Sequence, residues 1–95
     1  MMVLTEPTIA LREALAAAGL PVADLDAPGR RFYAFDDGRA GYGGLEGEGE
    51  DRLLRSMVVT QDCRGQGLGR AMLAQLEAEA CRLGARRLHL LTDRP

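Results

Sequence analysis

The stretch CRGQGLGRAML, from Cys63 to Leu73, decides the fold of this chain. Glycine occupies every second position from Gly65 to Gly69, an arginine stands before the first glycine, and an apolar helical pattern follows at once. Glycines at a helix start let the backbone approach an anion, and the unpaired N–H groups of the first turn attract phosphate. The stretch therefore predicts a phosphate-binding loop at the start of a helix.

Two widespread phosphate-binding loops do not fit this stretch. A P-loop requires a lysine, and all twelve basic residues of the chain are arginine. A dinucleotide fingerprint G-x-G-x-x-G fails, because its third glycine position holds Arg70 when counted from Gly65 and Met72 when counted from Gly67. The pattern that fits is [RQ]-x-x-G-x-[GA], from Arg64 to Gly69.

The segments around the loop predict a strand, a helix and a second strand. The apolar run 52–59 precedes the loop and favours a strand. Residues 68–84 predict a helix that ends at Gly84, and residues 87–91 predict a last strand. A strand–helix–strand unit joins parallel strands by a right-handed crossover. The apolar face expected of the helix consists of Leu68, Met72, Leu76, Ala80 and Leu83.

The first half of the chain predicts a helix and a hairpin. The helix is capped by Thr5, has Glu6 and Pro7 in its first turn, and stops at Gly19. Its expected apolar stripe is Ile9, Leu11, Ala14, Leu15 and Ala18. A loop follows over 21–29, and a hairpin pairs 32–35 with 39–46 through a two-residue Asp37-Gly38 turn. The fold class expected is α/β (α+β): one domain over residues 1–95, with two helices and a mixed sheet.

The amino-acid composition limits the classes of binding partner that this chain could have. The net charge of −2, with 12 basic and 14 acidic side chains, lacks the basic excess typical of a nucleic-acid binder. No apolar run approaches the length of a membrane span, and the N-terminal sequence does not resemble a signal peptide. One histidine and two distant cysteines, Cys63 and Cys81, fall short of a zinc site and indicate free thiols in the cytoplasm. We therefore expect no nucleic acid, membrane or metal partner.

The loop and its flanks resemble a known superfamily. Residues 53–92 are similar, from end to end, to the acetyl-CoA motif of the GNAT superfamily of acyl-CoA N-acyltransferases. Residues 18–26 and 41–56 resemble, more narrowly, the arsenic-resistance-associated N-acetyltransferase subgroup. The resemblance covers nearly the whole chain, and it implies acetyl-CoA as co-substrate and a small-molecule amine as acceptor.

The resemblance also implies roles for individual residues. The loop would hold the CoA pyrophosphate, and Met57, Val58 and Val59 would pair their backbone with the pantetheine arm. A backbone N–H at Val58 would stabilise the oxyanion as the amine attacks directly, an effect worth roughly 3–4 kcal/mol when well aligned. The loop residues concerned are Arg64, Gly65, Gln66, Gly67, Leu68, Gly69 and Arg70.

For several side chains the sequence allows two interpretations. Glu46 is the candidate general base or amine-recognition group, or a solvated charge at a loop edge. Arg55 and Ser56 interrupt an apolar strand; they bind an acidic substrate in a cleft, or lie on a solvated sheet face. His89 alternates with Leu88 and Leu90 and is expected on a sheet surface rather than in catalysis. The remaining candidates, Cys63, Cys81, Tyr33 and Tyr42, are expected to be inert thiols and packing residues, with Cys63 the thiol nearer the cofactor loop.

The end of the sequence raises a last expectation. GNAT chains continue with a helix and two strands, and often place there a tyrosine that protonates the leaving thiolate, whereas no tyrosine follows Tyr42 here. The resemblance therefore implies the N-terminal part of a GNAT fold, with the C-terminal helix and strands missing. Two functions stay open: an N-acetyltransferase, or a non-catalytic module that self-associates by strand pairing, with or without CoA. The apolar last strand predicts a homodimer in either case.

Overall fold

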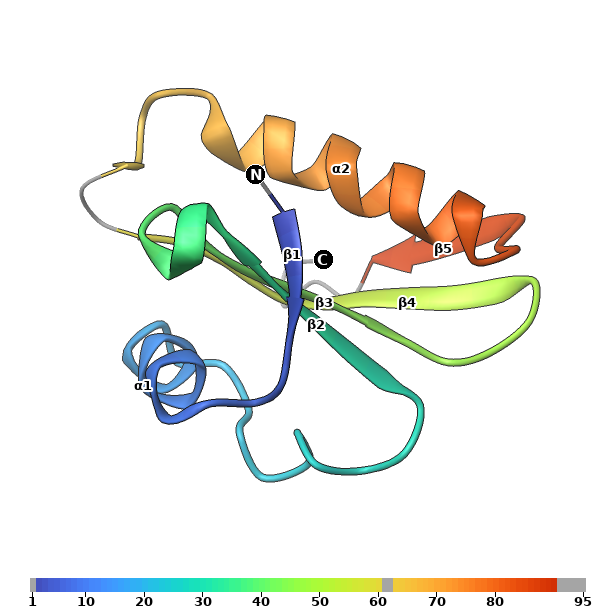
Figure 1. Cartoon of the computed structure of the whole chain (residues 1–95), viewed down its shortest axis with the longest axis horizontal. Helices are drawn as coiled ribbons and strands as arrows, with labels where there is room; N and C mark the ends of the chain where they lie inside the picture. Colours follow the sequence, from blue (N-terminus) through green and yellow to red (C-terminus); the bar gives the residue numbers. More distant parts are fainter. Residues whose placement is uncertain (1, 61–62, 91–95) are drawn as a thin grey trace.

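A computed structural model describes residues 2–60 and 63–90 of the chain. Its single sheet has the strand order β1-β2-β3-β4-β5, in which the first three pairs are antiparallel and β4–β5 is parallel. The predicted meander followed by one parallel crossover is therefore confirmed (Figure 1). The elements are β1 (Met2–Thr5), α1 (Ile9–Ala17), β2 (Arg30–Phe35), β3 (Gly41–Glu46), β4 (Asp51–Val59), α2 (Leu68–Arg82) and β5 (Arg87–Leu90).

The first strand was not predicted, and it moves the start of the first helix. Thr5 ends β1, so the prediction that Thr5 caps the helix, with Glu6 and Pro7 in its first turn, is wrong. Thr8 is the cap, because its Oγ1 accepts a hydrogen bond of 3.2 Å from the Leu11 N–H. Ile9 is 75% exposed, so the buried stripe of α1 reduces to Leu11 and Leu15.

The connection between β2 and β3 is longer than expected. Five residues, 36–40, separate the strands, and a short 3₁₀ turn at Asp36–Gly38 replaces the predicted two-residue turn. Asp36 and Asp37 both adopt positive φ, 53° and 55°, a conformation that aspartate tolerates better than most residues. The Ala40 N–H closes the loop on the Phe35 carbonyl at 3.1 Å.

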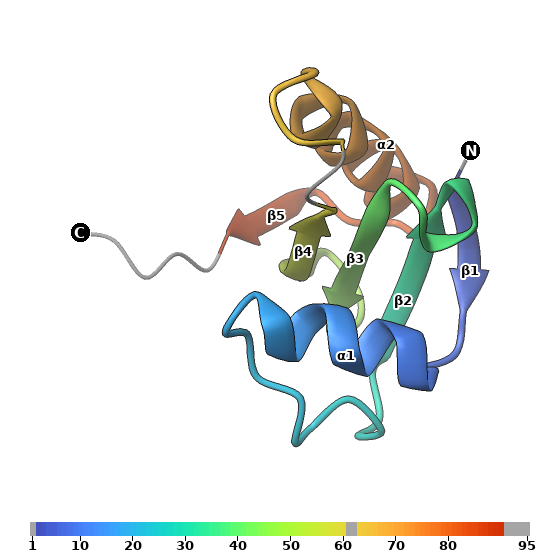
Figure 2. The ribbon, with the colours of Figure 1, turned by 90° about the vertical axis from the view of Figure 1, so that its left-hand side faces the viewer.

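The two helices cover opposite faces of the sheet (Figure 2). On the α2 face, the predicted side chains Met72, Leu76 and Ala80 are buried against Tyr33 and other sheet residues. The approach is close at Gly43 of β3, where an added Cβ would lie 2.7 Å from Leu76 Cδ1. On the α1 face, the core consists of Leu11, Leu15, Leu25, Phe32, Tyr42 and Val58.

Candidate functional site

The glycine loop forms the turn between β4 and α2. Gly65 and Gly67 have φ values of +80° and +73°, in the left-handed region that favours glycine. An added Cβ at either position would meet no atom of the described residues within 4 Å, so the loop backbone faces open space. Gly67 is the N-cap of α2, as the sequence pattern predicted for a loop that opens a helix.

The start of α2 lacks the protection that α1 has. Thr8 caps α1 with its side chain, whereas no side chain caps α2 among the described residues. The first turn of α2 contains no acidic residue, and Arg70 lies exposed within it. Among the described residues, the N–H groups at this helix start have no side-chain partner, and the positive end of the helix dipole lies next to an arginine. This arrangement suits a bound anion.

Three contacts hold the start of the loop, two with the segment that precedes β3 and one with the end of β4. The Thr60 Oγ1 donates a hydrogen bond of 2.6 Å to the Arg39 carbonyl, and the Thr60 N–H donates to the Ala40 carbonyl at 2.9 Å. Arg64 Nε donates to the Val59 carbonyl at 3.1 Å. The loop therefore has a fixed position relative to the strand, although its glycines are conformationally permissive.

The last part of β4 has a neighbour on one side only, within the described residues. The pairing of β4 with β5 ends at Leu54–Leu90, whereas the pairing with β3 continues to Val59. Backbone groups along a strand point alternately to its two edges. The Thr60 N–H faces β3 and the Val59 carbonyl faces away, so the backbone groups of Val58 face β3 and those of Met57 and Val59 face the open edge.

A β-bulge lies just before this open segment. Arg55 pairs with Gly44 and Val58 pairs with Tyr42, so three steps along β4 match two along β3. Ser56 takes a positive φ of 57° to accommodate the extra residue. As a result Arg55 and Val58 both face α1 although they are three positions apart. Side chains three apart in a regular strand would face opposite sides of the sheet.

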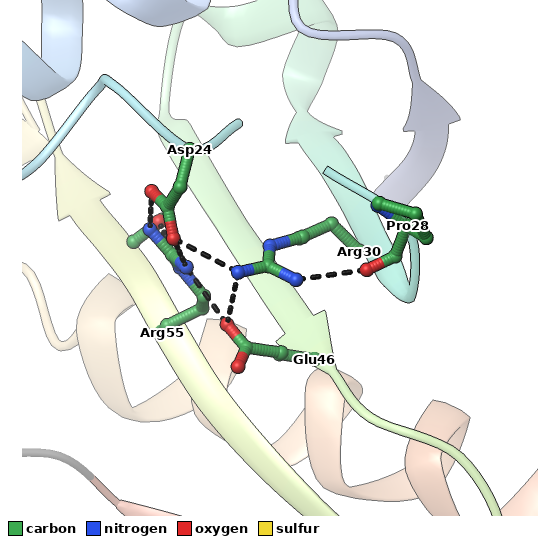
Figure 3. A network of polar contacts seen from close by, with 6 residues as sticks. Asp24, Pro28, Arg30, Glu46 and Arg55 are labelled. Carbon is green, nitrogen blue, oxygen red and sulfur yellow. Dashed lines mark hydrogen bonds and ion pairs between the residues drawn. The ribbon is translucent and has the colours of Figure 1, made fainter. Parts of the chain in front are cut away.

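Arg55 lies at the centre of an ion-pair network on the α1 face, shown in Figure 3. Its guanidinium donates to both carboxylate oxygens of Asp24, at 2.6 and 2.8 Å, and to Glu46 Oε1 at 2.8 Å. Its Nε donates to Ser56 Oγ at 3.1 Å. Arg30 approaches Asp24 Oδ2 at 3.0 Å and Glu46 Oε1 at 3.6 Å. The structure thus brings three predicted residues together, and adds Asp24 and Arg30.

The network shifts the pKa values of Asp24 and Arg55. Hydrogen bonds from Arg55 and then Arg30 hold the pKa of the Asp24 carboxyl well below its usual range. The hydrogen bonds that Arg55 donates to Asp24 and Glu46 raise its pKa above the ordinary value, against the opposing effect of burial. The Arg55 side chain is only 10% exposed. Arg55 therefore does not lie on a solvated sheet surface, and its charge is already paired with two carboxylates.

A cavity of about 650 Å³ adjoins this network. It lies between the loop that follows α1 and the middle of β4, and its volume is within the range of small-molecule sites. Glu46 and Arg55 line it, and Ser56 lies at the bulge beside the open edge of β4. The other lining residues are Gly19, Leu20, Pro21, Ala23, Asp24 and Leu53.

The remaining candidates lie outside this site. His89 is exposed on β5, and its Nε2 lies 3.1 Å from Asp51 Oδ1, as expected for a histidine on a sheet surface. Tyr33 and Tyr42 are buried packing residues, as predicted. Cys63 and Cys81 are free thiols. Leu91, the predicted end of the last strand, lies outside the described residues.

Comparison with solved structures identifies the class of this fold. The chain is similar to a ribosomal-protein-alanine N-acetyltransferase from Brucella melitensis biovar Abortus 2308, with a TM-score of 0.78, 18% identity, and coverage of 99% of this chain and 80% of that one. It is similar to an aminoglycoside acetyltransferase from an uncultured soil metagenomic sample (TM-score 0.69, 14% identity, coverage 100% and 80%). A predicted acetyltransferase with acetyl-CoA from Clostridium acetobutylicum also matches (TM-score 0.70, 12% identity, coverage 97% and 81%). The fold is that of the acetyltransferases.

The family follows from a second comparison. The model of the acetyltransferase (GNAT) domain family matches residues 28–95. The chain belongs to the GNAT acetyltransferase domain family, whose members use acetyl-CoA. A comparison with curated protein sequences found no relative of this chain. Nothing in these comparisons supports the narrower resemblance to the arsenic-resistance subgroup.

Two further features of the described residues concern metal ions and membranes. Within residues 2–60 and 63–90, no group of three or more His, Cys, Asp or Glu side chains is placed to hold a metal ion. Neither described helix has the length and apolar character needed to cross a membrane.

Proposed function

We propose that this chain binds acetyl-CoA and transfers its acetyl group to the amine of a small molecule. The observation that carries the proposal is a juxtaposition: among the described residues, the start of α2 has no side-chain cap, and it lies at the end of a strand segment that has no neighbour on one edge. The first feature suits a pyrophosphate, and the second suits an extended amide chain. CoA joins these two chemical groups in one molecule.

The pyrophosphate is assigned to the glycine loop. The N–H groups around Gly65, Gly67 and Gly69 surround the anion, and Gln66 and Leu68 contribute backbone to the same turn. Arg64 and Arg70 supply positive charge on either side. Both positive-φ glycines face open space, which a phosphate would fill.

The pantetheine arm is assigned to the open edge of β4. Its amides pair with the outward-facing backbone groups of Met57 and with the Val59 N–H, as a peptide adds to a sheet edge, whereas the Val59 carbonyl accepts from Arg64. The backbone alternation turns the N–H of Val58 toward β3, so we assign the oxyanion role to Met57 in place of Val58. Met57 is also the residue of this pair that lies nearer to the cavity at Ser56.

The reaction is a direct transfer. The nitrogen lone pair of the neutral amine attacks the thioester carbonyl carbon, and the negative charge on oxygen is stabilised by the Met57 N–H. The C–S bond then breaks, and CoA leaves as a thiolate that takes up a proton. The nitrogen, once bonded to the acyl carbon, gives one proton to the carboxylate of Glu46, directly or through water, and keeps the other as the amide N–H. Arg55 and Ser56 position Glu46 and line the acceptor side.

The comparisons lend support from neighbouring proteins. The Clostridium acetobutylicum structure is described as an acetyltransferase with acetyl-CoA, and the soil metagenomic protein as an aminoglycoside acetyltransferase. A small-molecule amine is therefore a reasonable acceptor for this chain too. Its free cysteines fit a reducing compartment, and we propose the cytoplasm.

We also propose that the chain forms a two-fold homodimer through β5. Leu90 is 56% exposed on this strand, which pairs with β4 on one side only within the described residues. An open apolar edge of this kind pairs readily with a second copy.

The function is tested by following release of the CoA thiol from acetyl-CoA in the presence of a panel of primary amines. Thiol release that depends on both chain and amine is the expected result. A calorimetric titration with CoA accompanies the assay. Absence of CoA binding would overturn the cofactor assignment, whereas binding without thiol release for any amine would overturn the transfer.

A further inference from the structure

The cavity beside Arg55 has a charge pattern that selects among amines. It adjoins the bulge at Ser56, and the segment that begins at Met57 is the one assigned to the thioester. An acceptor that reaches Met57 from the α1 face would therefore pass through this cavity. The class of amine that this cavity accepts is inferred on the basis of the proposed function.

The guanidinium of Arg55 is not available to an incoming carboxylate. It forms a double hydrogen bond with Asp24, a third hydrogen bond with Glu46 and a fourth with Ser56. Opening these contacts would leave Asp24 with Arg30 as its remaining cationic partner among the described residues, and would separate two charges next to an Arg55 side chain that is only 10% exposed. Removal of one partner from such a pair is costly. An acidic acceptor therefore finds no free cation here, contrary to one of the two interpretations of Arg55 from sequence.

One carboxylate oxygen of Glu46 takes no part in the contacts with the two arginines. The contacts of Glu46 with Arg55 and Arg30 both go to Oε1. The second oxygen has no partner among the described residues, and Figure 3 shows it pointing away from the two guanidinium groups. A carboxylate oxygen at the wall of a cavity accepts a hydrogen bond from an ammonium group.

A second feature adds negative potential. Gly19 and Leu20, which follow the C-terminal end of α1, line the same cavity. The last turn of α1 contains no basic residue, and the N–H groups of Gly19 and Leu20 pair with the carbonyls of Ala16 and Leu15, so the negative end of its dipole is compensated only in part. A cation is therefore favoured from two directions, by Glu46 and by the helix end.

The rest of the wall is apolar. Leu20, Pro21 and Leu53 surround the space next to Glu46. Apolar walls with a few polar groups orient a ligand by its apolar body and its single polar end.

We infer that the cavity takes a primary amine on an apolar body, and that it rejects the same body when a carboxylate is attached to it. The acceptor class is thus an aralkyl or alkyl amine rather than an amino acid or an acidic amine.

Three probes that share one phenylalkyl body test this inference: phenethylamine, phenylalanine and phenylpropionate. They are titrated separately into the full chain and followed by nuclear magnetic resonance. We expect phenethylamine to bind at least tenfold more tightly than phenylalanine, with phenylpropionate weaker still. Equal affinities for phenethylamine and phenylalanine, or no binding of phenethylamine, would overturn the inference.

Glu46→Gln and Glu48→Gln form a matched pair of variants. Glu46→Gln should weaken phenethylamine binding at least tenfold, and the Arg55–Asp24 pair remains to hold the fold. Glu48 is exposed, so Glu48→Gln should bind as the wild type does. Unchanged binding in Glu46→Gln would count against the role of Glu46, and if that variant unfolds, the three probes on the wild type decide alone. A CoA titration of the same samples tests the cofactor assignment separately, because that assignment fails only if CoA does not bind.

Discussion

Asp24 and Arg55 lie 31 positions apart in the chain, and their side chains form two hydrogen bonds of 2.6 and 2.8 Å. Asp24 belongs to the loop after α1, and Arg55 belongs to the strand at the centre of the candidate site. The pair therefore attaches that loop to β4 and fixes one wall of the acceptor cavity.

The first prediction concerns acid. The pKa of Asp24 lies well below its usual range, because Arg55 and Arg30 stabilise the carboxylate. The unfolded chain therefore takes up the proton at a higher pH than the folded chain, and acid favours unfolding. Asp24→Asn should lower the free energy of unfolding near neutral pH. The difference from wild type should shrink as the pH falls from about 5 toward about 2, since Asp24 of the unfolded wild-type chain takes up its proton in this range.

Urea unfolding at a series of pH values measures this difference. Asp37→Asn is the matched control, because Asp37 is exposed and its positive φ suits asparagine equally well. A difference between Asp24→Asn and wild type that stays constant with pH would contradict the prediction.

The second prediction separates binding from backbone strain in the loop. Gly67→Ala should cost about 1–2 kcal/mol of stability, because a Cβ is unfavourable at positive φ. Gly49→Ala should cost a similar amount, since Gly49 has φ +74° and an equally open surrounding. Only Gly67→Ala should also weaken CoA binding in calorimetry. Equal loss of CoA affinity in the two variants would remove this loop from the site.

The third prediction concerns the last glycine of the motif. Gly69 lies inside α2 with ordinary helical backbone, and an added Cβ would sit 3.6 Å from Val59 Cγ2. Gly69→Ala should therefore raise the free energy of unfolding by roughly 0.5–1 kcal/mol through helix propensity. CoA binding should persist, because the sequence pattern admits alanine at this position. A loss of stability in urea unfolding would show that the contact with Val59 is tighter than described.

The fourth prediction concerns Tyr33, whose hydroxyl donates a hydrogen bond of 2.7 Å to Glu79 Oε2. Burial and then this bond raise the pKa of Tyr33 to about 12. The unfolded chain loses this proton at a lower pH, near about 10. The contribution of Tyr33 to the free energy of unfolding should therefore be fully present below that pH and fall as the pH rises further. Phenolate absorbance in the Tyr42→Phe background follows Tyr33 alone.

Glu79→Gln should lower the pKa of Tyr33 in this background, because the charge of Glu79 contributes to raising it. Glu77→Gln, on an exposed position of the same helix, is the control. An unchanged titration in Glu79→Gln would leave burial as the whole cause.

The fifth prediction tests the dimer by sedimentation at micromolar concentration. Leu90→Lys should shift the chain toward monomer, because a lysine on an edge strand opposes pairing with a second chain. Ile9→Lys should leave the assembly unchanged, although Ile9 is the more exposed of the two residues, because it lies on α1. A wild-type chain that sediments as a monomer would contradict the dimer itself.

Local sequence patterns predicted most of the fold. The α2 helix begins at Leu68 as expected and buries the expected face, because glycine before and after the helix marks both ends. The first strand was missed because four residues next to a helix cap carry too little periodicity to be recognised. The turn after β2 was misjudged because Asp36 also enters the left-handed region, which the sequence alone does not show.

The candidate site was predicted in part. The loop from Arg64 to Gly69 follows from spacing, because neighbouring residues build it. Asp24 and Arg30 were not predicted, since their importance depends on contacts across the sheet with Arg55 and Glu46. The bulge at Ser56 was also missed, because no glycine marks it and serine seldom adopts positive φ.

The bulge at Ser56 shifts the alternation of side chains along β4 by one residue. Before it, odd-numbered side chains such as Arg55 face the acceptor cavity; after it, even-numbered ones such as Val58 face that side. Removal of this one residue would turn Met57 and Val59 from the α2 core toward the opposite face. In the proposed function, the strand therefore joins two halves: the first would face the acceptor, and the second would offer its edge to the acyl donor. The side chains of each half can change independently only as long as the extra residue at position 56 keeps the alternation of the two halves one residue out of step.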